Sequence, residues 1–153
     1  MRSSHRLAPA LGLALALSTV LAPAAAAQGR SPADARLVDG HRLTMPMLRK
    51  VLPALSAPGS ASCPRDRRDP RSLALAEMAQ MIERCAPMAQ ALRRAAVPPR
   101  EAALVMASLY RTAEAVAIRR GDVNAVDQGP LRDNALLMQE NDAEIKRLTG
   151  ENR

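Results

Sequence analysis

Apolar residues in this chain recur at intervals of three and four, which is the spacing of one face of an α-helix. The clearest case is the stretch 99–118, which begins with Pro99, has no interior Gly or Pro, and is followed by Gly121. Its stripe consists of Val105, Leu109, Thr112 and Val116. We predict one long helix here, and because it is apolar on more than one side, neighbouring segments should pack around it.

The same spacing predicts further helices in the rest of the chain, over residues 44–55, 72–84, 86–96 and 131–148. Thr44 and Ser72 are favourable N-terminal caps, and Gly150 is a favourable stop. Strict alternation of apolar and polar residues, the mark of a strand, does not extend beyond about four positions. The pattern therefore predicts an all-α fold, a small irregular bundle of four to five helices.

Two asparagines interrupt the apolar seam predicted for the last helix. Asn134 and Asn141 lie at positions that otherwise hold Leu, Met and Ile. They should either form hydrogen bonds inside the bundle or set the register against a partner helix.

Composition limits what the core can contain. The chain has no Phe and no Trp, and Tyr110 is its one aromatic residue. The core must therefore consist of Leu, Ile, Val, Met and Ala, which suits closely packed helices better than sheets. Tyr110 follows the stripe residue Leu109, and we expect its ring to be buried.

The first 27 residues have the layout of a secretory signal peptide. Arg2 and Arg6 precede an apolar stretch, and Ala25 and Ala27 provide small side chains before the expected cleavage point. The alternative is an uncleaved anchor, for which the apolar stretch is short. We predict cleavage of 1–27, export to the periplasm or the exterior, and no membrane span in the mature chain.

Removal of the leader leaves a chain with two predicted parts. Residues 28–43 are polar and contain Gly29, Pro32 and Gly40, so we expect a flexible N-terminal arm or an irregular arm that lies on the domain. Residues 44–150 form a single helical domain of ordinary size. The net charge of the whole chain is +7 and falls to about +5 without the leader, which is moderate.

Cys63 and Cys85 are the two cysteines of the chain, and both lie in the predicted exported part. Such pairs are oxidised to disulfides in export compartments. Their spacing matches neither a C-x-x-C redox motif nor a zinc motif. We predict a structural disulfide worth about 3 kcal/mol, which would fasten the Pro- and Ser-rich loop 56–71 to the end of the helix predicted over 72–84.

Four arginines gather in this loop, and they could contact an anion or an acidic partner. They are Arg65, Arg67, Arg68 and Arg71. The alternative is a solvated charged surface. No aromatic residues alternate with the basic ones, so base stacking is not available and the sequence argues against a nucleic-acid partner.

A second alternative involves metal. His41 is the one histidine after the predicted leader, and it lies close to Met45 and Met47. Imidazole and thioether groups are suitable ligands for Cu(I), so copper handling is chemically possible. The competing interpretation is that methionine fills gaps in a core without Phe. We predict no cofactor.

The sequence contains no set of residues typical of an enzyme. It lacks a G-x-S-x-G motif and a phosphate-binding glycine loop, and one mature histidine offers little acid–base chemistry. We therefore predict a non-enzymatic exported protein that acts by binding an unknown protein or cell-envelope component. The alternatives are the copper-handling protein and an enzyme with an unrecognised site.

Overall fold

The computed structural model describes residues 30–64 and 66–151, and the regular structure in these ranges is entirely helical. The α-helices are α1 (Pro32–Gly40), α2 (Met45–Leu55), α3 (Leu75–Arg84), α4 (Ala86–Arg94), α5 (Pro99–Ile118), α6 (Pro130–Glu140) and α7 (Asp142–Thr149). The all-α prediction is confirmed, but the described residues contain seven α-helices instead of four to five. The predicted leader, residues 1–27, lies outside the described residues.

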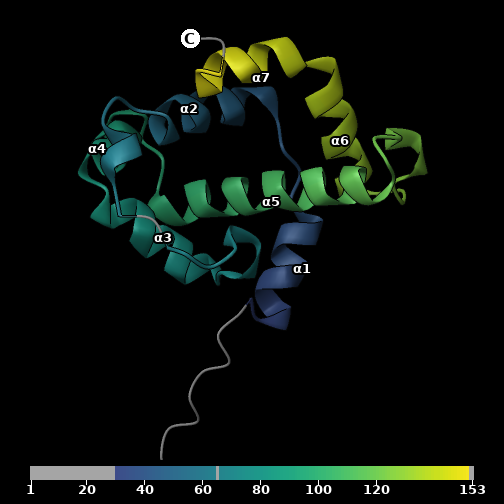
Figure 1. Cartoon of the computed structure of the whole chain (residues 1–153), viewed down its shortest axis with the longest axis horizontal. Helices are drawn as coiled ribbons and strands as arrows, with labels where there is room; N and C mark the ends of the chain where they lie inside the picture. The colour runs from purple at the N-terminus through teal and green to yellow at the C-terminus, as the bar shows by residue number, and fades with distance from the viewer. Residues whose placement is uncertain (1–29, 65, 152–153) are drawn as a thin grey trace, which may run out of the picture.

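Helix α5 is the element around which the others pack. In Figure 1 it crosses the middle of the molecule, with α1 and α3 below it and α2, α6 and α7 above it. Its bounds are those predicted, and Ala102, Ala103 and Ala107 on it are fully buried. Because these side chains are small, neighbouring helices can approach its backbone closely.

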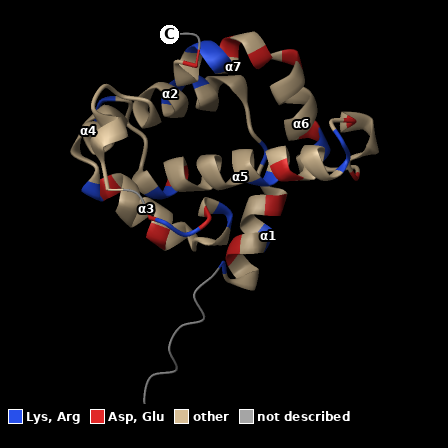
Figure 2. Ribbon diagram, viewed as in Figure 1, with Lys and Arg blue, Asp and Glu red and all other residues tan. Residues whose placement is uncertain are grey.

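Charged residues lie mainly around this central element. Figure 2 shows Lys, Arg, Asp and Glu on the outer helices and loops, while the part of α5 that passes through the centre is uncharged. The core that it joins is aliphatic, as the composition requires. Its largest fully buried apolar side chains are Leu48, Leu73, Leu75, Met78, Ile82, Leu92, Val38, Val51 and Val105.

Part of the arm expected to be flexible is the helix α1. The Ser31 hydroxyl accepts a hydrogen bond from the Asp34 backbone N–H (3.0 Å), which caps the helix. Val38 is 1% exposed and joins the core, and Asp39 forms an ion pair with Arg111 of α5 (3.0 Å). Residues 32–40 of this segment are thus helical, since a short helix can be stabilised by a few tertiary contacts.

The helix predicted over 131–148 is divided at Asn141 into α6 and α7. Asn141 has a non-helical backbone (φ −115°, ψ 20°), and its side chain donates a hydrogen bond to the Leu137 carbonyl (2.8 Å). Asn competes well for such bonds outside a helix, which explains the break. The continuous seam is thus wrong, and α7 turns to pack on α2 (Figure 1).

The segment between α2 and α3 consists of turns. It contains two 3₁₀ turns, Ser60–Ser62 and Pro70–Ser72. Because Ser72 belongs to the second of these turns, α3 begins at Leu75 and not at Ser72.

Within the described residues, we find no helix with the length and apolar character needed to cross a membrane.

Candidate functional site

A disulfide joins Cys63 in this turn segment to Cys85, as the sequence predicts. The two Cα atoms are 5.4 Å apart. Cys85 is buried at the junction of α3 and α4, so the bond fastens the turns to the bundle. The position of the segment 56–73 is thereby fixed next to α3, α4 and α5.

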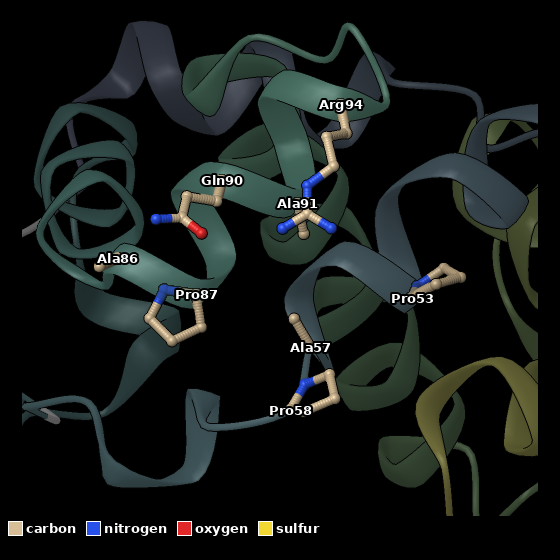
Figure 3. A pocket seen from close by; sticks show the side chains of 8 residues that line it. All are labelled: Pro53, Ala57, Pro58, Ala86, Pro87, Gln90, Ala91 and Arg94. Carbon is tan, nitrogen blue, oxygen red and sulfur yellow. The ribbon is translucent and has the colours of Figure 1, made fainter.

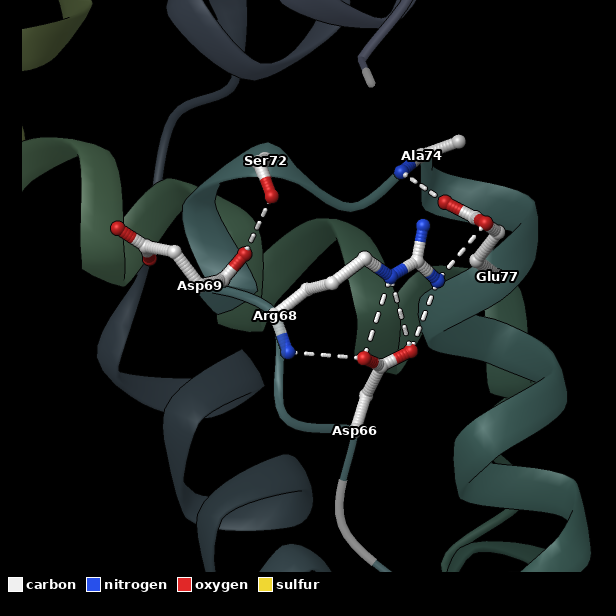
Figure 4. A network of polar contacts seen from close by, with 6 residues as sticks. All are labelled: Asp66, Arg68, Asp69, Ser72, Ala74 and Glu77. Atoms are coloured by element: carbon white, nitrogen blue, oxygen red, sulfur yellow. Dashed lines mark hydrogen bonds and ion pairs between the residues drawn. The ribbon is translucent and has the colours of Figure 1, made fainter. Parts of the chain in front are cut away.

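A network of charged side chains fastens the same segment at a second point (Figure 4). The Arg68 guanidinium donates hydrogen bonds to the Asp66 carboxylate (2.8 Å from Nη2 to Oδ2) and to the Glu77 carboxylate (3.0 Å). Glu77 also accepts a hydrogen bond from the backbone N–H of Ala74, which caps α3 (2.9 Å). One arginine therefore connects the turn segment to the first turn of α3.

The pKa values of both carboxylates in this network are lowered. Hydrogen bonds from the Arg68 side chain, supported by its backbone N–H, lower the pKa of Asp66 to about 2. The pKa of Glu77 is also lowered, first by the hydrogen bond from the Ala74 backbone and then by Arg68. Both groups are ionised at neutral pH and compensate the charge of Arg68.

The arginines predicted to contact an anion differ in their surroundings. Arg68 is compensated as described, and Arg71 pairs with Asp69 (2.7 Å) and more distantly with Glu114 (3.8 Å). Arg67 is exposed, and Arg65 lies outside the described residues. Contact with an anion at this loop stays a prediction, but two of its arginines already have carboxylate partners.

A groove of about 590 Å³ lies between the turn segment and the helices. Its floor and walls are mostly apolar, and they include Leu55, Leu73, Met81, Met88, Met106 and Tyr110. The disulfide also lines it, and the paired Asp66 and Arg68 stand at its edge. We call this feature the methionine groove, because α3, α4 and α5 each contribute one methionine to it.

The sequence pattern indicates methionine in general as a filler of the core, but it does not predict that Met81, Met88 and Met106 line one groove. Met81 and Met106 are each next to a fully buried residue, Ile82 and Val105, and are themselves only partly buried. In the sequence, the one sign that these methionines are partly exposed is their position next to a residue of the buried stripe. This sign cannot show that three helices bring such positions together.

The prediction that Tyr110 is buried is wrong. Its residue surface is 40% exposed, whereas we expected a buried ring. The side chain lies one position outside the buried stripe of α5 and lines the methionine groove. An exposed aromatic side chain with a polar tip at the edge of a groove is well suited to contact a ligand.

The possible copper ligands lie on two neighbouring elements, and copper binding by them stays a prediction. His41 ends α1, while Met45 and Met47 occupy the first turn of α2, two residues apart and hence on different faces of the helix. Burial of the imidazole lowers the pKa of His41, and Glu101 opposes this effect. Among the described residues, no three His, Cys, Asp or Glu side chains are placed to hold a metal ion.

Comparison of the chain with protein-family models, curated proteins and solved structures gives no significant match.

Proposed function

We propose that this is a small exported protein that acts by binding, and that the methionine groove receives an apolar segment of a protein partner. The observation that carries the proposal is the groove itself, an apolar surface open to solvent and bounded by a disulfide-fastened segment. Open apolar surfaces of this kind commonly mark sites of interaction.

The side chains of the groove suit a peptide of variable sequence. Methionine is unbranched and polarizable, so Met81, Met88 and Met106 can adjust to side chains of different shape. Tyr110 adds a rigid aromatic surface at low entropic cost. Asp66 and Arg68 at the edge of the groove form an ion pair and neutralise each other's charge, which favours an uncharged apolar segment over an ionic one.

Polar groups beside the apolar floor favour a peptide over a lipid chain. The residues Ser56 and Ser60 also line the groove, and their hydroxyls can pair with the N–H and C=O groups of a peptide backbone. An acyl chain would leave these hydroxyls without partners and would gain less from binding.

The disulfide supports the exported location on which this proposal rests. Disulfides persist in the periplasm and outside the cell, whereas the cytosol keeps thiols reduced. Together with the leader-like first 27 residues, the disulfide favours a partner in the cell envelope or beyond it.

A site-specific photocrosslinker would test the proposal in cells. A benzophenone amino acid replaces Tyr110 in one strain and Ile118 in another. Both residues are exposed on α5 (40% and 68%), but Ile118 does not line the groove. We expect a crosslinked envelope protein from position 110 and none, or much less, from position 118.

The captured protein must then bind in a purified system. We expect Tyr110→Lys to weaken that binding at least about tenfold, because it places a charge at an apolar contact, while Ile118→Lys has little effect. Equal crosslinking from both positions, or binding that is insensitive to Tyr110→Lys, would contradict the proposal.

A further inference from the structure

A second hollow lies on different residues, between α2 and α4. It has a volume of about 500 Å³, and Figure 3 shows Arg94 reaching from α4 over Ala91 toward the helix that carries Pro53. Gln90, one turn earlier on α4, lines the same hollow. It continues into a neighbouring hollow of about 390 Å³ that shares Pro53, Ala91 and Arg94 and adds Lys50. We call the two hollows together the basic cleft.

In the described part of the chain, two cations of the basic cleft, Lys50 and Arg94, lack the carboxylate partners that Arg68 and Arg71 have in the loop. Among the described residues that line it there is no Asp or Glu. Arg49, which lines the second hollow, pairs with Glu144 (2.8 Å), but Lys50 and Arg94 form no ion pair with any described residue. The loop arginines Arg68 and Arg71, by contrast, are both paired. Two cations without an ion pair among the described residues, Lys50 and Arg94, therefore line this cleft.

We infer that the basic cleft is a binding site for a phosphate group. Lys50 and Arg94 supply two positive charges with N–H donors, and Arg94 lines both hollows. A phosphate monoester carries a charge of about −1.5 to −2 at pH 7 and several acceptor oxygens, which matches this set better than a single carboxylate does. The Pro and Ala side chains around the cations leave room for an uncharged part of the ligand.

The phosphate group could belong to a soluble ester or to a lipid headgroup, and two assays distinguish these sources. Calorimetric titration with inorganic phosphate at low salt tests the first. Sedimentation with phosphatidylcholine vesicles that contain phosphatidic acid tests the second, with pure phosphatidylcholine vesicles as the control.

The decisive variant is Lys50→Ala/Arg94→Ala, and the matched control is Arg93→Ala. Arg93 also lies in the last turn of α4 but does not line the cleft. We expect the double variant to weaken binding at least about tenfold, and Arg93→Ala to change it less than about twofold. All of these side chains are exposed, so an unchanged thermal unfolding curve will show that the fold is kept.

Each result has a defined meaning. If the double variant loses binding only in the vesicle assay, the phosphate belongs to a lipid. If it loses binding only in the phosphate titration, the phosphate belongs to a soluble ester. Loss of binding in both assays supports the shared phosphate chemistry. The inference is overturned if the wild-type protein binds neither probe, if the double variant binds like wild type, or if Arg93→Ala loses as much.

Discussion

Asn134 joins α6 to the connection between α1 and α2 through one buried amide. Its side-chain oxygen accepts a hydrogen bond from the Leu43 N–H (2.8 Å), and its NH₂ group donates one to the His41 carbonyl (2.9 Å). Both partners lie in the short connection between α1 and α2, and Asn134 is 1% exposed. The residue therefore satisfies the backbone of a buried turn from α6.

We expect Asn134→Ala to destabilise the protein by about 2–3 kcal/mol, because it leaves a buried N–H and C=O without partners. Urea unfolding followed by circular dichroism measures this change. Asn141→Ala is the control, since Asn141 is less buried and bonds within its own chain segment. A loss at Asn134 no larger than that at Asn141 would contradict the assigned role.

His41 makes stability depend on pH. Its Nε2 atom is buried without a hydrogen-bond partner among the described residues, and burial lowers the pKa of the imidazole below 6.5. The unfolded chain therefore binds the proton first as the pH falls. The stabilising effect is fully present above pH 6.5 and is lost as the pH drops through the lower pKa of the folded state.

The expected result is a urea midpoint that decreases between pH 7.5 and pH 5 in the wild type and decreases less in His41→Gln. Both carboxylates of the Arg68 network have lowered pKa values, so they titrate below this window. Identical decreases in the two proteins would show that another group is responsible.

At the scale of elements, the position of the segment 56–73 depends on two interactions, the disulfide and the ion pair of Arg68 with Glu77. It has two short 3₁₀ turns and no longer helix, so its own hydrogen bonds contribute little to its position. The disulfide holds its centre, and Arg68 holds its end to α3. The shape of the methionine groove follows from these fastenings.

Reduction of the disulfide should lower the free energy of unfolding by about 3 kcal/mol. Urea unfolding with and without dithiothreitol measures the loss, and the variant Cys63→Ala/Cys85→Ala should not respond to the reductant. Hydrogen exchange should accelerate most in residues 56–73 and least in α5. Uniform acceleration would mean that the bond supports the whole fold and not this segment.

At the scale of the whole molecule, close packing around α5 sets the fold. Ala102, Ala103 and Ala107 have no exposed surface, so no larger side chain fits without movement of a neighbouring helix. α3, α6 and α1 pack most extensively against α5.

We expect Ala103→Leu to destabilise the protein by about 1–3 kcal/mol, because it overfills a packed interface. Thermal or urea unfolding measures the effect. Ala113→Leu, at an exposed position of the same helix, should leave stability nearly unchanged. Equal effects at the two positions would contradict the packing argument.

The sequence alone determined the helical class, the bounds of α5 and the disulfide. These features depend on local information, namely the period of apolar residues, the Pro99 start and a pair of cysteines without alternative partners. The same local information placed Thr44 as the cap of α2, where its hydroxyl accepts a hydrogen bond from the Met47 N–H (3.4 Å).

Only the tertiary structure decided the features that depend on distant residues. The helix α1 is ordered by contacts with α5, and Asn134 meets a turn that lies some ninety positions away, with a separation of 91 to Leu43. The methionine groove and the basic cleft each combine residues from several elements. The charge balance of the arginines also depends on folding, because folding brings Glu77 to Arg68 and Glu114 to Arg71. Periodicity describes one helix at a time, whereas surfaces and charge balance arise where helices meet.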